Sequence, residues 1–256
     1  MSPAYERPGK RAYEALRPIE INVGVSKFAE GSCQIRFGDT EVLCLATVDE
    51  SVPRHLIGKD QGWVTAEYAM LPRSTPERSK RESLEGRPGG RTFEIQRLVG
   101  RSLRAAVDLK ALGSRSVIID CEVIQADGGT RTAAITGGYI ALAHALRHFT
   151  PKPLRKNVAA VSAGFVKGEL VLDLEYVEDS VADADLNVVQ TLRGDLVEVQ
   201  GTAEGAAFPR QRLDQLLDLA SSGITQLFAT QHAALSHALG AEAAARVWPT
   251  PDSGAA

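Results

Sequence analysis

The sequence predicts an α+β fold built from two similar halves. Three observations support this class. First, the N-terminal part is a series of short β-rich runs. Second, two helical segments alternate with a strongly indicated strand. Third, the chain beyond residue 157 repeats the order of strands followed by a helix. A Pro-containing link at residues 150–157 is the expected boundary between the halves.

The first half begins with an expected antiparallel meander. Three runs rich in β-forming residues predict its strands, 17–28, 31–37 and 41–48, and a further strand is expected at 63–68. Gly38-Asp39-Thr40 separates the second run from the third and is a good hairpin turn. The stretch 71–90 has little apolar periodicity, several charges and Gly89-Gly90, so we expect an exposed, mobile arginine-rich loop.

A helix should follow this loop, because apolar residues there recur at helical spacing. Its expected inner face consists of Ile95, Leu98, Val99, Leu103, Ala106 and Val107. Thr92 is the expected N-cap. Next come a strand at 116–125, a turn at 126–129 and a helix over 130–149, which Gly137-Gly138 either breaks or packs closely against a neighbour.

The second half predicts a similar set of elements. They are strands at 158–166 and 169–176, a hairpin of 186–192 with 196–201, and a helix over 208–239 with a weak point at Gly223. The tail after Trp248 is expected to be disordered.

Composition indicates an ordinary globular protein with no membrane span. Apolar residues make up 44% and charged residues 24% of the chain, and the polar N-terminus has no apolar secretory stretch, so we expect a cytoplasmic protein. Cys33, Cys44 and Cys121 are far apart in sequence. They indicate buried, reduced thiols rather than a thiolate metal site.

Charge is unevenly distributed although the net charge is only −3. Residues 73–104 hold nine Lys or Arg and four Glu, a local balance of +5, whereas residues 169–198 hold nine acidic residues and one Arg, a balance of −8. This contrast suits a polyanionic substrate with a bound cation. The alternative is two solvated surfaces that happen to differ.

Three clusters could carry chemistry. Gly128-Gly129 and Thr130-Arg131 stand where a strand turns into a helix, so backbone amides, a hydroxyl and a forked cation could hold an anion there. Gly89 to Thr92 places Arg91 similarly, and the acidic residues of 178–185 form an oxygen-ligand set suited to Mg²⁺. The alternatives are an ordinary glycine turn, a surface arginine and a solvated acidic loop.

None of the five histidines falls in these clusters, so no residue there is arranged to activate water. Inorganic phosphate is already an anion and needs only positive groups and a metal around it. The clusters therefore favour phosphate as the nucleophile.

Four segments resemble the signatures of the bacterial ribonuclease PH family: 62–75, 90–109, 121–137 and 197–204. The resemblance runs from about residue 17 to about 239. It implies a phosphate-dependent nucleotidyltransferase that trims the 3′ end of precursor tRNA, releases nucleoside diphosphates and adds nucleotides in reverse.

The resemblance also implies roles for particular residues. Arg91, Gly129, Thr130 and Arg131 are the expected phosphate-binding residues, Asp179 and Asp185 the expected catalytic, metal-linked pair, and Arg73, Arg78 and Arg81 the expected tRNA contacts. Mg²⁺ and inorganic phosphate are the implied cofactor and co-substrate.

The implied fold is like the second domain of ribosomal protein S5, followed by a smaller C-terminal α+β part. The expected divisions are an extension (1–16), an N-terminal domain (17–150), a C-terminal domain (157–240) and a tail (241–256). A homohexamer, a trimer of dimers, is the implied assembly. Three alternatives are a non-catalytic subunit of an exosome-like ring, half of a polynucleotide phosphorylase and a hydrolytic exonuclease.

Overall fold

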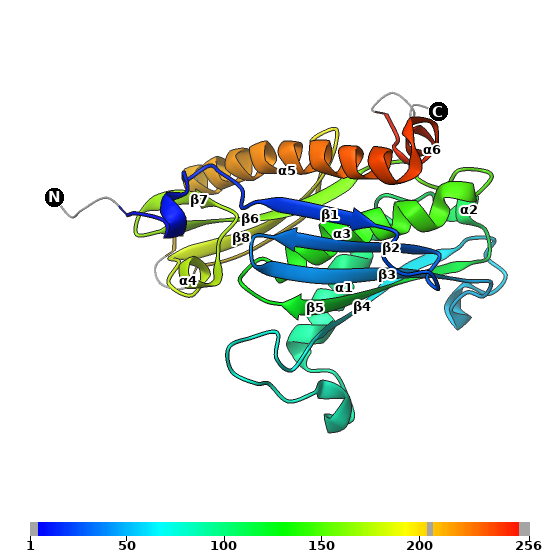
Figure 1. Ribbon diagram of the computed structural model, residues 1–256, viewed down its shortest axis with the longest axis horizontal. Coiled ribbons are helices and arrows are strands. Elements are labelled where there is room, and N and C mark those ends of the chain that lie inside the picture. The colour runs from blue at the N-terminus through cyan, green and yellow to red at the C-terminus, as the bar shows by residue number, and fades with distance from the viewer. Residues whose placement is uncertain (1–4, 204–206, 251–256) are drawn as a thin grey trace.

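Two β-sheets with helices between and across them make up the protein in the computed structural model, which describes residues 5–203 and 207–250 (Figure 1). The predicted α+β class is confirmed. Residues 1–4 of the expected extension, Glu204 at the end of the fourth signature segment and residues 251–256 of the expected tail lie outside the described residues.

The first sheet has the strand order β1-β2-β3-β5-β4. Its strands are β1 (Ile19–Val23), β2 (Gly31–Phe37), β3 (Thr40–Asp49), β4 (Trp63–Met70) and β5 (Ser116–Gln125). Only β4 and β5 pair in parallel, so a crossover must join them, and it contains the arginine-rich loop, α1 (Gly90–Arg104) and α2 (Leu109–Leu112). The predicted hairpin between β2 and β3 is confirmed.

The second sheet is antiparallel throughout, in the order β7-β6-β8-β9. Its strands are β6 (Val158–Val166), β7 (Glu169–Leu172), β8 (Ala184–Thr191) and β9 (Leu196–Ala203). The long helix α5 (Arg210–Leu239) crosses this sheet and reaches β1 of the first sheet, and α6 (Ala241–Val247) follows it (Figure 1). Short 3₁₀ turns occupy Pro8–Lys10, Arg54–Leu56, Glu82–Glu85 and Leu146–His148.

Helix α3 (Thr130–Ala145) lies in the middle of the molecule. It packs against β2 and β3 of the first sheet on one side and against β6 of the second on another. Nearly all of its residues are buried, which explains why its sequence is apolar all round instead of amphipathic. Most buried apolar residues of both halves consequently form one continuous cluster, and a small second cluster consists of Val166, Val171, Leu174 and Ala182.

Close packing, not a break, explains the glycines within the helices. A Cβ atom at Gly137 would lie 2.6 Å from Cγ2 of Ile35 in β2, and one at Gly223 would lie 2.8 Å from Cδ2 of Leu172 in β7. Both helices run straight through these positions. Of the two alternatives for Gly137-Gly138, close packing is confirmed, and α5 is not interrupted at Gly223, where a weak point was expected.

The three cysteines are buried and free, as predicted. They are cross-strand neighbours, because Cys33 pairs with Cys44 and Cys44 pairs with Cys121. Within the described ranges, no helix combines the length and the apolar character that crossing a bilayer requires.

Three local expectations were wrong. The strand expected at 17–28 is confined to β1, and the one expected at 169–176 ends at Leu172, where Asp173 takes a left-handed conformation with φ +53°. Thr92 does not cap α1, because the helix already begins at Gly90 and the Thr92 hydroxyl instead donates to Glu82.

A Gly137→Ala substitution should destabilise the fold by about 1–3 kcal/mol, because the stiff, β-branched Ile35 must move to admit the new methyl group. Gly90→Ala is the matched control, since nothing lies within 4 Å of its Cβ position. The control should be neutral or stabilise the protein by up to about 1 kcal/mol. Urea unfolding curves measure both values, and equal midpoints would contradict the packing argument.

Candidate active site

A cleft of about 1200 Å³ opens where the two halves meet. From the first half, the starts of α1 and α3 and the turn at 126–129 line it. From the second half come α4 (Tyr176–Asp179), β8 and β9. Polar side chains dominate its second-half wall, among them Ser162, Asn187, Gln200 and Thr202. None of the five histidines, all of which lie in the described part of the chain, lines the cleft.

The fold brings six of the nine predicted site residues to this one cleft. They are Arg91, Gly129, Thr130, Arg131, Asp179 and Asp185. They come from four different elements, so only the tertiary structure could join them. This arrangement places two guanidinium groups and two carboxyl groups around the same space.

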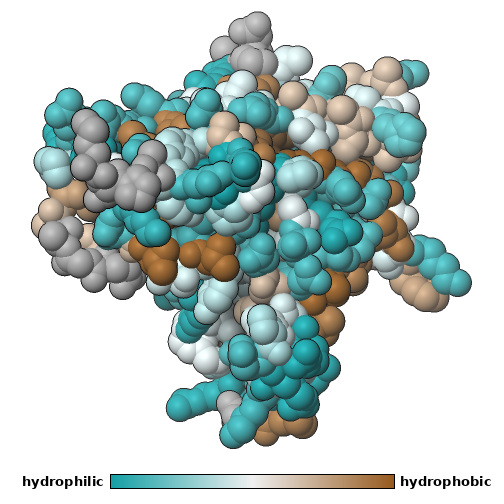
Figure 2. Space-filling model, turned by 60° about the vertical axis from the view of Figure 1, so that its left-hand side comes forward, coloured by the Kyte–Doolittle hydropathy of each residue, from teal (hydrophilic) through white to brown (hydrophobic). Residues whose placement is uncertain are grey.

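The other three predicted residues, Arg73, Arg78 and Arg81, do not line the cleft and are exposed on the arginine-rich loop. This loop projects from the body of the molecule (Figure 1), and Figure 2 shows the projection as mainly hydrophilic. Residues Thr75 to Glu77, near the start of the loop, do form part of the cleft wall. The loop therefore begins at the site and extends away from it.

The turn before α3 is shaped by two consecutive left-handed glycines, Gly128 (φ +76°) and Gly129 (φ +66°). Gly129 is the N-cap of α3. The first N–H groups of this 16-residue helix, which have no partner within the helix, therefore lie next to the turn. Tyr68 fixes the side chain of Thr130, because the Tyr68 hydroxyl donates a hydrogen bond to Thr130 Oγ1 at 2.8 Å.

Tyr68 is a buried residue that sequence reasoning did not single out. Burial raises the pKa of its phenol above the ordinary value. The hydrogen bond to Thr130 and the positive charges of Arg91 and Arg131 lower this pKa but do not outweigh burial. The phenol therefore stays protonated and acts as a donor, and both arginines lie near enough to influence it.

Arg131 is already oriented by partners from both halves. Its Nη1 donates to Glu94 Oε1 of α1 at 3.2 Å and to Gln200 Oε1 of β9 at 3.1 Å. Its side chain is only 17% exposed, whereas Arg91 is exposed at the cleft mouth. An anion bound between them would meet one exposed and one pre-oriented guanidinium group.

The acidic segment 178–185 is neither a simple loop nor a single set of ligands. Glu175 and Glu178 form a capping box that starts the single-turn helix α4, and Asp179 is its last residue. Asp185 lies in strand β8, and both aspartates line the cleft. Within the described ranges, no group of three or more His, Cys, Asp or Glu is placed to hold a metal ion.

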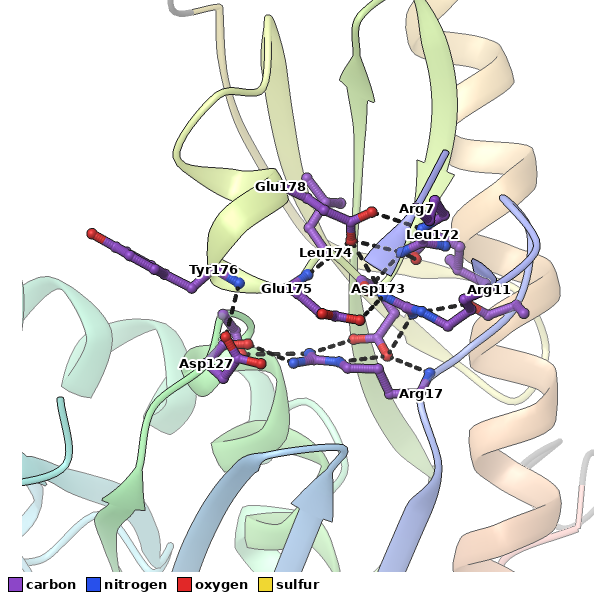
Figure 3. A network of polar contacts seen from close by, with 12 residues as sticks. Arg7, Arg11, Arg17, Asp127, Leu172, Asp173, Leu174, Glu175, Tyr176 and Glu178 are labelled. Atoms are coloured by element: carbon purple, nitrogen blue, oxygen red, sulfur yellow. Dashed lines mark hydrogen bonds and ion pairs between the residues drawn. The ribbon is translucent and has the colours of Figure 1, made fainter. Parts of the chain in front are cut away.

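The N-terminal segment fixes α4 through buried ion pairs (Figure 3). Arg7 donates to both carboxyl oxygens of Glu178, from Nε at 2.7 Å and from Nη2 at 2.8 Å, and both side chains are fully buried. Arg11 donates to Glu175 and Glu178. Glu178 thus faces away from the cleft, although the sequence places it among the expected metal ligands.

Arg17 also belongs to this network. Its Nε and Nη2 donate to Asp173 at 3.0 and 2.7 Å, and its Nη1 donates to the backbone oxygen of Asp127 at 2.6 Å. Sequence patterns assign no role to Arg7 or Arg11, and they place Arg17 only at the start of a strand. No pattern among residues 5–17 marks these partners, because each contact joins positions more than 100 residues apart.

Comparison with known protein families identifies the fold. Residues 15–147, more than half of the chain, match domain 1 of the 3′ exoribonuclease family, and residues 156–223 match its domain 2. The chain belongs to the 3′ exoribonuclease family. It is thus a member of a family of the phosphorolytic, ribonuclease PH type.

Solved structures share this two-domain fold. An exosome chain from Archaeoglobus fulgidus, solved with RNA bound to the active site, has a TM-score of 0.76 at 24% identity, covering 88% of this chain and 92% of that one. Rice (Oryza sativa) Rrp46 has a TM-score of 0.74 at 18% identity, with coverages of 88% and 97%. An archaeal exosome core chain gives 0.67 at 24%, with coverages of 84% and 86%.

Replacing Glu178 by Gln should destabilise the protein by about 3–5 kcal/mol at neutral pH, because Arg7 would keep its buried charge without a counter-ion. Burial raises the pKa of Glu178, but hydrogen bonds from Arg7 and the Glu175 N–H and the charges of Arg7 and Arg11 outweigh it and lower the pKa below its ordinary value.

The stabilising effect of Glu178 is therefore complete above its unfolded pKa and is lost as pH falls through the lower, folded one. The difference between the wild type and Glu178→Gln should shrink below about pH 4. Asp195→Asn, at an exposed carboxyl group 3.7 Å from Lys156, is the control and should change little. Thermal unfolding at several pH values measures this, and a constant difference would contradict the assignment.

Proposed function

We propose that this protein is a phosphorolytic 3′-to-5′ exoribonuclease of the bacterial ribonuclease PH type, a phosphate-dependent tRNA nucleotidyltransferase. The observation that carries the proposal is the meeting of Arg91 and Arg131, from the starts of two helices, with Asp179 and Asp185 in one cleft. Family membership supports the reaction class.

In this reaction, Arg91, Arg131, Thr130 and the Gly129 turn hold inorganic phosphate. One phosphate oxygen attacks the phosphorus of the last phosphodiester, and the bond from that phosphorus to the 3′ oxygen of the preceding nucleotide breaks. The shortened RNA keeps that oxygen and takes up a proton as its new 3′ hydroxyl. The released product is a nucleoside 5′-diphosphate, and excess diphosphate reverses the reaction.

Asp179 and Asp185 would hold Mg²⁺ in this proposal. Two carboxyl groups are too few for a metal site made of protein alone, but Mg²⁺ commonly binds through one or two carboxylates together with substrate phosphates. The residues present therefore fit the ion. When bound, it would neutralise negative charge on the reacting phosphates.

Precursor tRNA is the proposed substrate, held by Arg73, Arg78 and Arg81. These arginines are exposed on a loop whose root lines the cleft, so they could contact the RNA body while its 3′ end enters the site. The resemblance to the ribonuclease PH family also supports a homohexamer, a trimer of dimers, in the cytoplasm, without membrane attachment.

A second candidate is a non-catalytic subunit of an exosome-like ring, since the similar solved structures come from exosomes and include rice Rrp46. The gathering of both arginines and both aspartates in one cleft favours the enzyme, because a scaffold has no need of them together. RNA binding without any nucleotide release would support the subunit instead.

The reaction is tested by chromatography of the nucleotides released from a tRNA with extra 3′ residues. We expect nucleoside diphosphates at a rate that depends on phosphate. Arg91→Ala should lower phosphate-dependent activity by about 10- to 150-fold, the value of a charge-assisted contact. Arg97→Ala, on the same helix but outside the cleft lining, is the matched control. Monophosphates released at full rate without phosphate would make the protein a hydrolase.

Replacing Arg73, Arg78 and Arg81 by Ala should weaken tRNA binding. If each contacts one phosphate, the slope of log affinity against log salt should become shallower by about 2 to 3. A short single-stranded oligonucleotide should be affected less, since it need not reach the loop. The control removes three exposed charges elsewhere, at Arg54, Arg193 and Arg246. An unchanged slope with tRNA would rule out phosphate contacts by the loop.

A further inference from the structure

Two buried side chains, those of Arg17 and Thr40, fix the glycine turn that precedes α3. Arg17 donates from Nη1 to the Asp127 oxygen at 2.6 Å and from Nη2 to the Gly128 oxygen at 3.4 Å. The Thr40 hydroxyl donates to the same Gly128 oxygen at 2.6 Å and accepts from the Asp127 N–H at 2.9 Å. Both backbone carbonyl groups that precede Gly129 are therefore fixed.

Arg17 is in turn anchored in the second half. It makes three hydrogen bonds to Asp173, from its backbone N–H at 2.8 Å and from two side-chain nitrogens. Burial lowers the pKa of Arg17, but the charge and hydrogen bonds of Asp173 outweigh it and raise that pKa, so the guanidinium group remains ionised. Figure 3 shows Arg17 lying between Asp127 and Asp173.

The turn also packs directly against the second half of the protein. A Cβ atom at Gly128 would lie 2.5 Å from the backbone oxygen of Leu174. The Tyr176 N–H, at the start of α4, donates to Asp127 Oδ1 at 3.3 Å. The turn that precedes Thr130 and Arg131 is thus joined to the helix that carries Asp179.

The direction of the carbonyl groups matters for an anion. In a planar trans peptide, the N–H of one residue points opposite to the C=O of the residue before it. Holding the oxygens of Asp127 and Gly128 toward Arg17 and Thr40 therefore turns the N–H groups of Gly128 and Gly129 the other way. Both glycines line the cleft, whereas Arg17 and Thr40 do not.

We propose that Arg17 and Thr40 are positioning residues that set the phosphate affinity of the cleft by fixing the Gly128-Gly129 turn relative to the second half. This inference rests on the proposed phosphorolytic function. Neither side chain touches phosphate, because Thr40 is completely buried and Arg17 is only 4% exposed. They act through the backbone of the turn, and Arg17 also carries the connection to Asp173.

Thr40 provides the sharper test, because Thr→Val replaces only the hydroxyl, by a methyl group of similar size. Loss of its hydrogen bonds should raise the KM for phosphate about 3- to 10-fold and leave the KM for RNA unchanged. Thr40→Ser keeps the hydroxyl and should restore the wild-type value. Arg17→Lys keeps the charge but cannot span Asp173 and both carbonyl groups, so it should raise the phosphate KM at least as much.

Thr136→Val is the matched control. Thr136 is also completely buried, and its hydroxyl likewise donates to one backbone oxygen and accepts from one N–H, both of Ala160. It lies outside the cleft lining. This variant should lose thermal stability to a similar degree as Thr40→Val while keeping the wild-type KM for phosphate.

The equilibrium affinity for inorganic phosphate, measured by titration calorimetry on folded protein, separates this inference from the proposed function. If the wild type binds phosphate but releases no diphosphates, the proposed reaction fails and the phosphate Kd still tests the two residues. In the other case, the wild type phosphorolyses RNA, but the folded variants Thr40→Val and Arg17→Lys have the same phosphate KM and Kd as the wild type. The role of Thr40 and Arg17 is then structural only, and the inference is wrong. Loss of affinity in Thr136→Val equal to that in Thr40→Val would overturn it as well.

Discussion

The buried ion pairs between the N-terminal segment and the residues around α4 are the interaction on which the site depends. Asp173 and Glu178 are fully buried carboxyl groups, and each is stable there only because an arginine from residues 5–17 neutralises it. These pairs hold the single-turn helix that carries Asp179, a helix far too short to be stable by itself. The position of one candidate catalytic carboxyl group is therefore set by chain segments more than 150 residues apart.

Periodicity and turn residues predicted much of the fold because they are local signals. The hairpin at Gly38, the strand 116–125, the helix beginning at Thr130 and the helix ending at Leu239 are all found close to their expected bounds. The errors also have a local cause. A continuous acidic run looks like a solvated bend, and only its partners show that Glu178 is buried while Asp179 and Asp185 line the cleft.

The candidate site could be predicted residue by residue but not as an arrangement. Arg91 and Arg131 could be named from glycines ahead of helices, yet their meeting depends on how α1 and α3 pack on one sheet. Tyr68, Glu94 and Gln200, which orient Thr130 and Arg131, have no distinguishing sequence pattern. Each is an ordinary strand or helix residue whose role comes from a neighbour remote in sequence.

The position of α3 between the two sheets has an evolutionary consequence. Residues 150–157 separate two stretches of sequence, but the apolar cluster on either side is shared, so the boundary does not separate two units of stability. Exchange of one half for that of a diverged relative would bring together surfaces of α3 and β6 that had changed independently. Such chimaeras require matched substitutions on both surfaces, and in this protein the halves are therefore constrained to diverge together.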